Sequence, residues 1–225
     1  MRAPLSVVIP TLNAQGELPG CLEALVEGLR AGIIREVIVS DGGSSDATVR
    51  IAEGAGAVVV SGAASRGGQL RRGGEAAQGV WFLFLHADSR LPIGWSDVVA
   101  AHFDSDRVGY GRLRFDARGF APRWVAGWAN LRSRLLGLPY GDQGLLISAQ
   151  TYHDIGGYED VPLMEDVAIA RRLSGRLQML PMEVTTGAIR YQKAGWFKRG
   201  ARNLSILVQY FLGASASDLS DRYRR

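Results

Sequence analysis

Three points in the sequence carry carboxylates beside an apolar run. Asp41 closes one such run and leads into a turn rich in glycine and serine. His86 and Asp88 directly follow another, and Glu165 and Asp166 open an amphipathic segment. A carboxylate can accept hydrogen bonds from a ligand, hold a divalent cation or remove a proton. These points are therefore the candidates for a chemical site.

The turn after Asp41 has two interpretations. Glycine supplies positive φ and Ser or Asp caps the next helix, which accounts for Gly42 through Asp46. It does not account for an acid at position 41. The functional alternative gives Asp41 a hydrogen bond to a nucleobase or ribose, with Gly42 and Gly43 letting the backbone come close. Both interpretations stay open on these residues alone.

His86 and Asp88 share one side of an extended chain, so imidazole and carboxylate can converge on one point. Mg²⁺ or Mn²⁺ held by one or two carboxylates and by substrate phosphates needs little more from a protein. The structural alternative is that Asp88 caps the turn before Leu91-Pro92.

Glu165 and Asp166 stand where a helix is expected to begin. The helix dipole favours an acid in the first turn, which explains one of the two. Two adjacent carboxylates are more than a cap requires, and one of them could serve as a general base.

Strand and helix patterns alternate over the first ninety residues. Each expected strand is apolar throughout, which predicts a parallel sheet covered by helices on both faces. Ligands bind beyond the carboxyl ends of such strands, where the polar loops 10–13, 41–46 and 86–89 should meet. The strands are expected at Ser6–Ile9, Glu36–Ser40, Val58–Val60 and Val80–Leu85, and the helices at Leu18–Arg30, Asp46–Glu53 and Gln69–Gln78.

The rhythm changes after Asp88 to a mixed pattern without repeats or a linker, so the chain is expected to form one domain. One expected helix carries Trp124, Trp128, Leu131 and Leu135 along a single stripe. The strands are expected at Val108–Phe115, Gly144–Ser148 and Leu177–Leu180, and the helices at Trp95–Phe103, Ala121–Leu136, Asp166–Leu173 and Phe197–Leu212.

Composition narrows the class of protein. The 225 residues are 47% hydrophobic and 21% charged with net charge +4, typical of a globular chain that folds without disulfides. Without runs of like charge, an RNP pattern or zinc-finger spacing, no nucleic-acid partner is expected. The absence of Walker A and Gly-x-Gly-x-x-Gly motifs disfavours P-loop and dinucleotide sites. A short apolar start and the single Cys21, expected to be a buried hydrophobe, point to the cytoplasm.

Four motifs in this order resemble glycosyltransferase family 2, over about Leu5–Leu173. They are Val7–Asn13, Val39–Thr48, Phe84–Asp88 and the pair Glu165-Asp166. The nearest branch is a small bacterial one with a Leu-His-Ala-Asp motif, here Leu85–Asp88, preceded by Arg-x-x-Gln, here Arg66–Gln69. The resemblance implies a GT-A fold, which is an α/β, Rossmann-like, mostly parallel central sheet with helices on both faces and a mixed acceptor-side half. It also implies inverting, metal-dependent transfer from a nucleoside-diphosphate sugar.

The resemblance divides the single domain 1–225 into a nucleotide-sugar-binding half (1–90), an acceptor and catalytic half (91–195) and a C-terminal helical segment (196–225). It implies that Asp166 is the catalytic base, with Glu165 as an acceptor contact. Mn²⁺ or Mg²⁺ is expected on Asp88, with His86 as a further ligand. The residues expected to bind the nucleotide sugar are Pro10, Thr11, Asn13, Asp41, Gly42, Arg66, Ala87 and Asp88. Gly141–Gly144 resembles the loop on the acceptor side.

Three departures from the family pattern matter. Ala14 stands where a glutamate is common, so one donor contact is missing or is supplied differently. His86 replaces the first acid of the Asp-x-Asp motif, which removes one negative charge from the metal site. The Gln-x-x-Arg-Trp motif of processive synthases is absent, which favours transfer of a single sugar.

The apolar end of Phe197–Leu212 follows Lys198, Arg199 and Arg202. An ordinary packed helix or a homodimer contact explains it, while a helix lying on the inner membrane face would suit a lipid-linked acceptor. Two other functions remain as alternatives: a non-catalytic nucleotide-sugar-binding or membrane adaptor protein, and a sugar-phosphate nucleotidyltransferase. The latter needs a glycine-rich basic loop after the first strand, and Pro10–Ala14 is neither.

Overall fold

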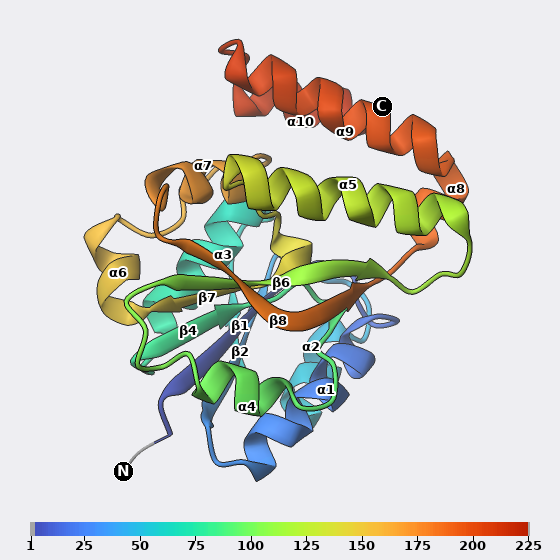
Figure 1. The fold of residues 1–225 in the computed structure, drawn as a ribbon. Coiled ribbons are helices and arrows are strands. Elements are labelled where there is room, and N and C mark those ends of the chain that lie inside the picture. Colours follow the sequence, from blue (N-terminus) through green and yellow to red (C-terminus); the bar gives the residue numbers. More distant parts are fainter. Residues whose placement is uncertain (1–2, 225) are drawn as a thin grey trace.

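The structure, a computed structural model, describes residues 3–224. They form one eight-stranded sheet in the order β3-β2-β1-β4-β7-β6-β8-β5 (Figure 1). The strands are β1 (Leu5–Thr11), β2 (Ile34–Asp41), β3 (Val58–Ser61), β4 (Trp81–Phe84), β5 (Ser89–Arg90), β6 (Val108–Phe115), β7 (Leu145–Ser148) and β8 (Leu177–Thr186).

The first half of the sheet is parallel and the second half is mixed. β1 pairs in parallel with β2 and β4, and β2 with β3. β7 is antiparallel to both β4 and β6, whereas β8 is parallel to β6 and antiparallel to β5. Thr11 lies opposite Asp41, so the carboxyl ends of β1 and β2 lie side by side. The expected α/β fold with a mostly parallel sheet is confirmed.

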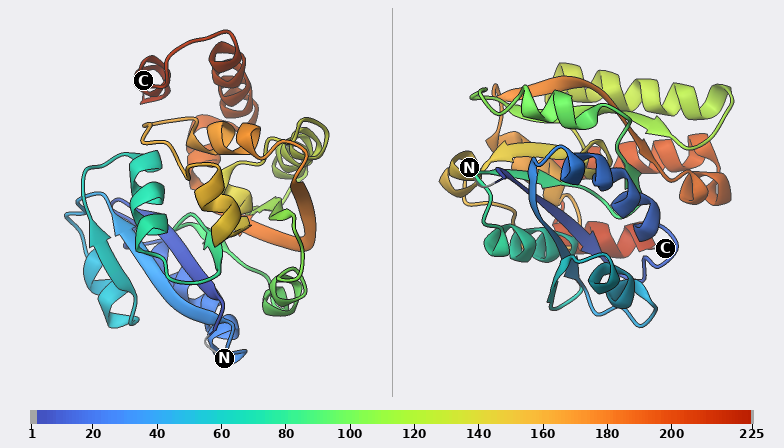
Figure 2. Two further views of the ribbon diagram at one scale, coloured as in Figure 1. Left: turned by 90° about the vertical axis from the view of Figure 1, so that its left-hand side faces the viewer. Right: turned by 90° about the horizontal axis from the view of Figure 1, so that it is seen from below.

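Helices cover both faces of the sheet (Figures 1 and 2). α1, α2 and α4 pack on one face, and α3, α6 and α7 on the other. α5 lies against β6, and α8, α9 and α10 follow β8 at the end of the chain. The helices are α1 (Leu18–Arg30), α2 (Thr48–Gly54), α3 (Arg66–Ala76), α4 (Trp95–Ala100), α5 (Phe120–Leu136), α6 (Ala149–Asp154), α7 (Glu165–Arg172), α8 (Ile189–Ala194), α9 (Trp196–Phe211) and α10 (Ala216–Arg224).

Alternation along the central strands explains why their sequences are apolar throughout. In β1, Leu5, Val7 and Ile9 join the core beneath α1 and α4, while Val8 joins the core beneath α3. Side chains of successive strand residues point to opposite faces, so both faces must be apolar when helices cover each of them. Cys21 is buried in the first of these cores, as expected.

Several boundaries differ from the sequence expectation. α3 begins at Arg66, three residues early, because the Ser65 hydroxyl accepts the Gly68 N–H and caps it. β8 continues beyond Leu180 to Thr186, and α6 was not expected.

The apolar stripe of α5 lies on the solvent side. Leu135 is 69% exposed and Trp124 53%, whereas the buried residues of this helix are Pro122, Val125, Ala126 and Ser133. Among the described residues, no helix combines the length and apolar content needed to cross a bilayer.

Candidate active site

Two adjoining cavities open at the carboxyl ends of β1 and β4. The larger, of about 530 Å³, is lined by the loop after β1, the start of α3 and part of α8. The smaller, of about 110 Å³, lies between the loop after β4, the start of α7 and helices α8 and α9. Arg66, His86, Asp88 and Arg190 line both, so the two cavities form one continuous site.

Asp41 organises the loops beneath the larger cavity. Its carboxylate accepts hydrogen bonds from the backbone N–H groups of Gly43 and Ser44 at 2.8 and 2.7 Å, from the Ser44 hydroxyl, and from the Thr11 hydroxyl at 3.0 Å. Burial opposes its ionisation, but these hydrogen bonds outweigh burial and lower its pKa. Asp41 is therefore a charged anchor that fixes the turn.

Two amides tie the first two loops together. Asn13, at φ 50°, accepts the Ser45 N–H on its side-chain oxygen at 2.9 Å. The buried Gln69 donates from Nε2 to the backbone carbonyls of Thr11 and Ser40, at 2.6 and 3.0 Å. The loop after β1 is thus held from both sides before any ligand binds.

The approach of α3 to the sheet positions two residues that line the larger cavity, Arg66 and Gln69. A Cβ on Gly73 would lie 2.3 Å from Val8 Cγ1, so only glycine allows this helix to lie so close to β1. Glycine lowers the helix propensity of this segment, but the close packing of α3 on β1 requires it.

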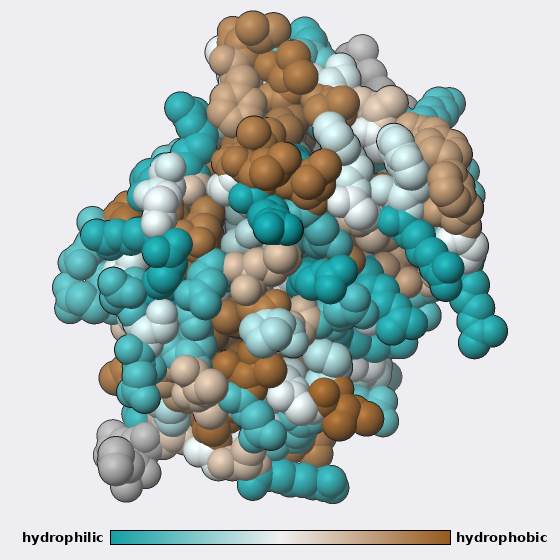
Figure 3. Space-filling model, viewed as in Figure 1, coloured by the Kyte–Doolittle hydropathy of each residue, from teal (hydrophilic) through white to brown (hydrophobic). Residues whose placement is uncertain are grey.

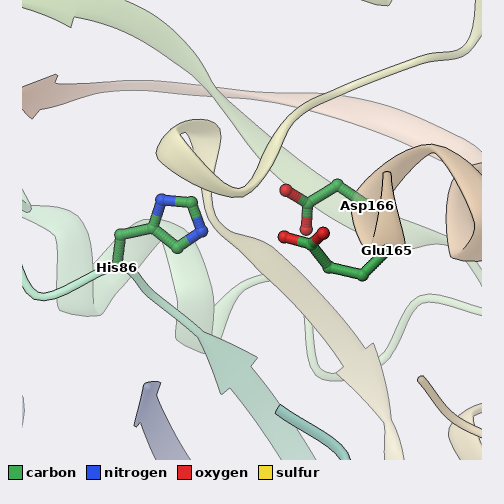
Figure 4. A group of neighbouring side chains, drawn as sticks. All are labelled: His86, Glu165 and Asp166. Carbon is green, nitrogen blue, oxygen red and sulfur yellow. The ribbon is translucent and has the colours of Figure 1, made fainter. Parts of the chain in front are cut away.

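His86 points toward the two carboxylates at the start of α7 (Figure 4). One ligand atom from each of His86, Glu165 and Asp166 lies within 4.8 Å of the others. Burial lowers the pKa of His86 well below its usual value, and the nearby charges of Arg66 and Arg190 lower it further. The imidazole is therefore neutral near pH 7 and has a lone pair to offer.

The carboxylate pair on α7 lies among few donors, with Glu165 buried and Asp166 half-buried. Met164 before it adopts a left-handed conformation at φ 67°, and Glu165 is 1% exposed. Burial and the charge of Glu165 raise the pKa of Asp166 to about 8. Burial also raises the pKa of Glu165, and Arg66 Nε, 3.5 Å from Glu165 Oε1, opposes that rise. The pair is poised to gain or lose a proton near neutral pH.

The loop Gly141–Gln143 closes the smaller cavity. The Gly141 N–H donates to Asp166 Oδ2 at 2.8 Å, and a Cβ on Gly141 would lie 2.2 Å from His86 Nε2. Asp142 adds a third carboxylate, and burial followed by the charge of Asp88 raises its pKa. Gly141 therefore sets the distance between imidazole and carboxylate.

The donor set of the smaller cavity fits a divalent cation. His86 Nε2 and both carboxylate oxygens of Glu165 are buried without a hydrogen-bond partner. Buried polar atoms without hydrogen bonds are costly, and a metal ion would satisfy the imidazole nitrogen, whereas Glu165 Oε1 already has Arg66 Nε at 3.5 Å. Asp88 lines the same cavity and offers a further oxygen. Imidazole with carboxylates suits Mn²⁺ as well as a hard, water-coordinated Mg²⁺.

The predicted site residues divide into two groups by position. Asp41 and Gly42 do not line either cavity and contact the site through Thr11 and Gln69. The others lie in the walls, although Asp88 is outside the close group formed by His86, Glu165 and Asp166. The residues that line a cavity are Pro10, Thr11, Asn13, Arg66, His86, Ala87, Asp88, Glu165 and Asp166.

Several residues of the C-terminal segment line the smaller cavity, although sequence reasoning assigned them no role there. Arg190 and Tyr191 of α8 and Asn203 of α9 reach it from the end of the chain. The Tyr191 ring packs on Phe115 and Trp196, with ring centroids 4.8 and 5.2 Å apart.

The fold and the site together define a class of protein. A parallel half joined to a mixed half, with residues of both lining one cavity, is the architecture of GT-A glycosyltransferases. The family model "Glycosyl transferase family 2" matches residues 6–153. The chain belongs to this family, as its motifs indicated.

The relatives identified by sequence align with only part of this chain. A PGL/p-HBAD biosynthesis glycosyltransferase of Mycobacterium tuberculosis is 35% identical over 99 residues, which are 40% of this chain and 38% of that relative. The chain therefore matches about two-fifths of the relative's length.

Two solved structures share the fold. Residues 1–349 of S. aureus TarS align over 91% of this chain and 65% of theirs, with a TM-score of 0.64 and 17% identity. Glucosyl-3-phosphoglycerate synthase of M. tuberculosis aligns over 82% and 70%, with a TM-score of 0.54 and 21% identity.

Proposed function

We propose that this protein transfers a single sugar from a nucleoside-diphosphate donor, with inversion and with a divalent cation, to an acceptor hydroxyl or a lipid phosphate. The observation that carries the proposal is that Asp88 and Asp166, from different halves of the chain, line one cavity. This cavity continues into a larger one beside the loop after β1. Direct displacement requires such a two-sided site.

The larger cavity suits the donor. Arg66, Arg190 and Lys193 line it, and their charges favour a diphosphate. The pairing of Arg66 with Glu165 holds the guanidinium where the two cavities meet. Solved neighbours include a TarS complex with UDP-GlcNAc and a glucosyl-3-phosphoglycerate synthase complex with Mn²⁺ and UDP. UDP-sugars with Mn²⁺ are therefore the first donors to test.

Asp88 and His86 would hold the divalent cation, whose positive charge would stabilise the leaving diphosphate. The close group of His86, Glu165 and Asp166 suggests a second arrangement. We favour the first because Arg66 already lies against Glu165, where a cation would meet a guanidinium. Electron paramagnetic resonance of bound Mn²⁺ separates the two: Asp88→Asn should release the ion and Glu165→Gln should retain it. The reverse result would assign the ion to α7.

Asp166 is the proposed general base for a hydroxyl acceptor. The acceptor oxygen attacks the anomeric carbon and its proton moves to the Asp166 carboxylate. The bond from that carbon to the diphosphate breaks, and its electron pair stays on the phosphate oxygen. A base works best with a pKa near the operating pH, which the raised pKa of Asp166 supplies.

A donor screen tests the proposal without knowledge of the acceptor. UDP-, GDP- and dTDP-sugars with Mn²⁺ are compared by thermal shift, and slow donor hydrolysis is then measured for the best ligand. We expect one nucleotide to stabilise the protein and to be hydrolysed only with the cation. Binding without any metal-dependent hydrolysis would favour the alternative, a non-catalytic nucleotide-sugar-binding or adaptor protein, and no binding would refute both.

A further inference from the structure

Helices α5 and α9 expose a large apolar surface, here called the α5–α9 face. Its side chains are 43–82% exposed, although most are Leu, Phe or Trp. Brown, hydrophobic residues gather over the C-terminal ends of the two helices at the top of Figure 3. The face consists of Phe120, Trp124, Trp128, Leu131, Leu135 and Leu136 on α5, and Phe197, Leu204, Val208, Phe211 and Leu212 on or just after α9.

The two helices present these residues as adjoining stripes. On α5 the spacing 120, 124, 128, 131, 135 places them on one side of the helix, opposite the buried Pro122 and Ala126. Trp124 contacts Phe197 with ring centroids 5.7 Å apart. Trp128 and Leu204 line the same narrow cavity between the helices. The face is therefore one continuous surface.

The two chain segments that form this face carry only positive charge. Segments 117–141 and 184–217, which contain α5, α8 and α9, hold nine of the 26 Lys and Arg residues and none of the 22 Asp and Glu residues. The rest of the chain has 17 basic and 22 acidic residues, so its net charge is −5. Arg123 and Arg134 are exposed beside the α5 stripe, and Lys198 is exposed beside Phe197.

An anionic lipid surface matches this combination. Exposed Trp, Phe and Leu enter the headgroup region of a bilayer, where tryptophan is favoured, and surrounding Lys and Arg contact anionic headgroups. A second copy of this chain fits less well, because a twofold contact would bring two positive faces together.

The face is also connected to the active site. The narrow cavity beneath it is lined by apolar side chains, namely Leu113, Trp128, Leu204 and Leu207. It also shares four lining residues with the smaller cavity of the candidate active site, namely Tyr140, Asp142, Tyr191 and Asn203. An amphiphile lying at the lipid surface could therefore direct its polar end toward Asp166.

We propose that the α5–α9 face docks this protein on membranes that carry anionic lipids. Docking is independent of transferase activity, and only the delivery of a lipid-linked acceptor rests on the proposed function. The surface is formed by residues outside the catalytic and donor-binding sets, so the two properties can be measured separately.

Vesicle co-sedimentation tests the docking. We expect wild-type protein to sediment with vesicles of equal parts phosphatidylcholine and phosphatidylglycerol and to bind pure phosphatidylcholine far less. Arg123→Gln/Arg134→Gln should weaken binding about 30-fold, since each basic residue near an anionic surface contributes about fivefold. The matched control is Arg30→Gln/Arg50→Gln, on α1 and α2 at the other end of the molecule, and should bind as wild type. Equal losses in both variants would overturn the assignment to this face.

The apolar part has its own variant and spectroscopic signal. Leu135→Gln/Leu212→Gln changes two side chains that are 69% and 82% exposed, so the fold is kept, and should weaken binding about tenfold or more. Tryptophan fluorescence should shift to the blue on lipid addition, and Trp124→Phe/Trp128→Phe should lose that shift while still sedimenting.

Three results would overturn the proposal: no binding of the wild type to anionic vesicles, binding unchanged by both the charge and the leucine variants, or a dimer that the leucine variant dissociates. The last would assign the face to a second copy. Donor hydrolysis in lipid-free buffer should be unchanged in the surface variants. Lipid binding by a protein without donor hydrolysis would refute the proposed function and leave docking standing.

Discussion

Replacing Asp166 by asparagine should make the protein more stable while removing its activity. Asparagine keeps an oxygen that can accept the Gly141 N–H, which now bonds Asp166 Oδ2 at 2.8 Å. It removes the charge that burial and Glu165 disfavour. The substitution therefore relieves an electrostatic cost without opening a cavity.

The size of the effect follows from the raised pKa. The folded state binds a proton on Asp166 up to about pH 8, whereas the unfolded chain releases it near 3.8. Proton binding by Asp166 therefore stabilises the folded state. This stabilisation is present in full below the pKa of the unfolded chain and is lost as the pH rises through the pKa of the folded state. Each pH unit between the two pKa values lowers the free energy of unfolding by about 1.4 kcal/mol. Because Asp166 is only half-buried, solvent screening reduces this effect. We expect Asp166→Asn to gain about 1–3 kcal/mol at neutral pH.

Urea unfolding over a pH series measures this gain and needs no substrate. The difference between variant and wild type should be near zero at about pH 4 and should grow to about pH 8. In thermal unfolding it corresponds to a Tm higher by about 3–9 °C at neutral pH. Asp106→Asn, an exposed carboxyl in the loop before β6, is the control and should show no such growth.

Donor hydrolysis by Asp166→Asn should fall about 100- to 10,000-fold, the range attributed to general bases. A difference in stability that is independent of pH would refute the buried-carboxylate reasoning. Retained activity would refute the role of Asp166 as the base while leaving the electrostatic argument intact.

Four further predictions follow from the geometry. Asp88→Asn should abolish Mn²⁺-dependent donor binding in calorimetric titration, whereas Asp166→Asn should retain it, because Asp166 does not line the larger cavity. Gly141→Ala should reduce donor hydrolysis about 100-fold with an unchanged circular dichroism spectrum, since the new Cβ displaces the imidazole. Gln69→Leu removes two buried hydrogen bonds, to the carbonyls of Thr11 and Ser40, of which Thr11 still accepts the Gly42 N–H, and should cost about 1–3 kcal/mol in urea unfolding. Burial raises the pKa of Cys21 to about 12, so a disulfide reagent should label it only in denaturant.

The fold could be predicted because its strands carry the pattern that burial on two faces demands. Val108–Phe115 has the expected bounds, and the other expected strands are present. β8 was predicted only to Leu180, because Pro181 interrupts the apolar pattern. The strand continues past a register shift opposite Tyr110 and Arg112, and that shift depends on the neighbouring strand.

The site was predictable where its residues follow strands or open a helix, as Asp88 and Asp166 do. Arg190 and Asn203 were not, because they reach the cavity through the packing of α8 and α9 rather than through a local motif. Asp41 illustrates a different difficulty. A carboxylate at a strand end looks the same in sequence whether it binds a ligand, anchors a turn or does both, and the four hydrogen bonds that Asp41 accepts establish only the second role.

The orientation of α5 depends on polar contacts that periodicity does not reveal. Asn130 bonds both the N–H and the carbonyl of Leu113, at 2.7 and 3.0 Å, and Ser133 donates to Gln143 Oε1 at 2.6 Å. These hydrogen bonds turn the side with small residues toward β6, so the Trp and Leu stripe must face outward. An apolar stripe predicts that one side of a helix is buried, but it does not say whether the protein core or another surface covers it. The absence of acidic residues from 117 to 141 is the sequence feature that favours an anionic lipid surface over the protein core.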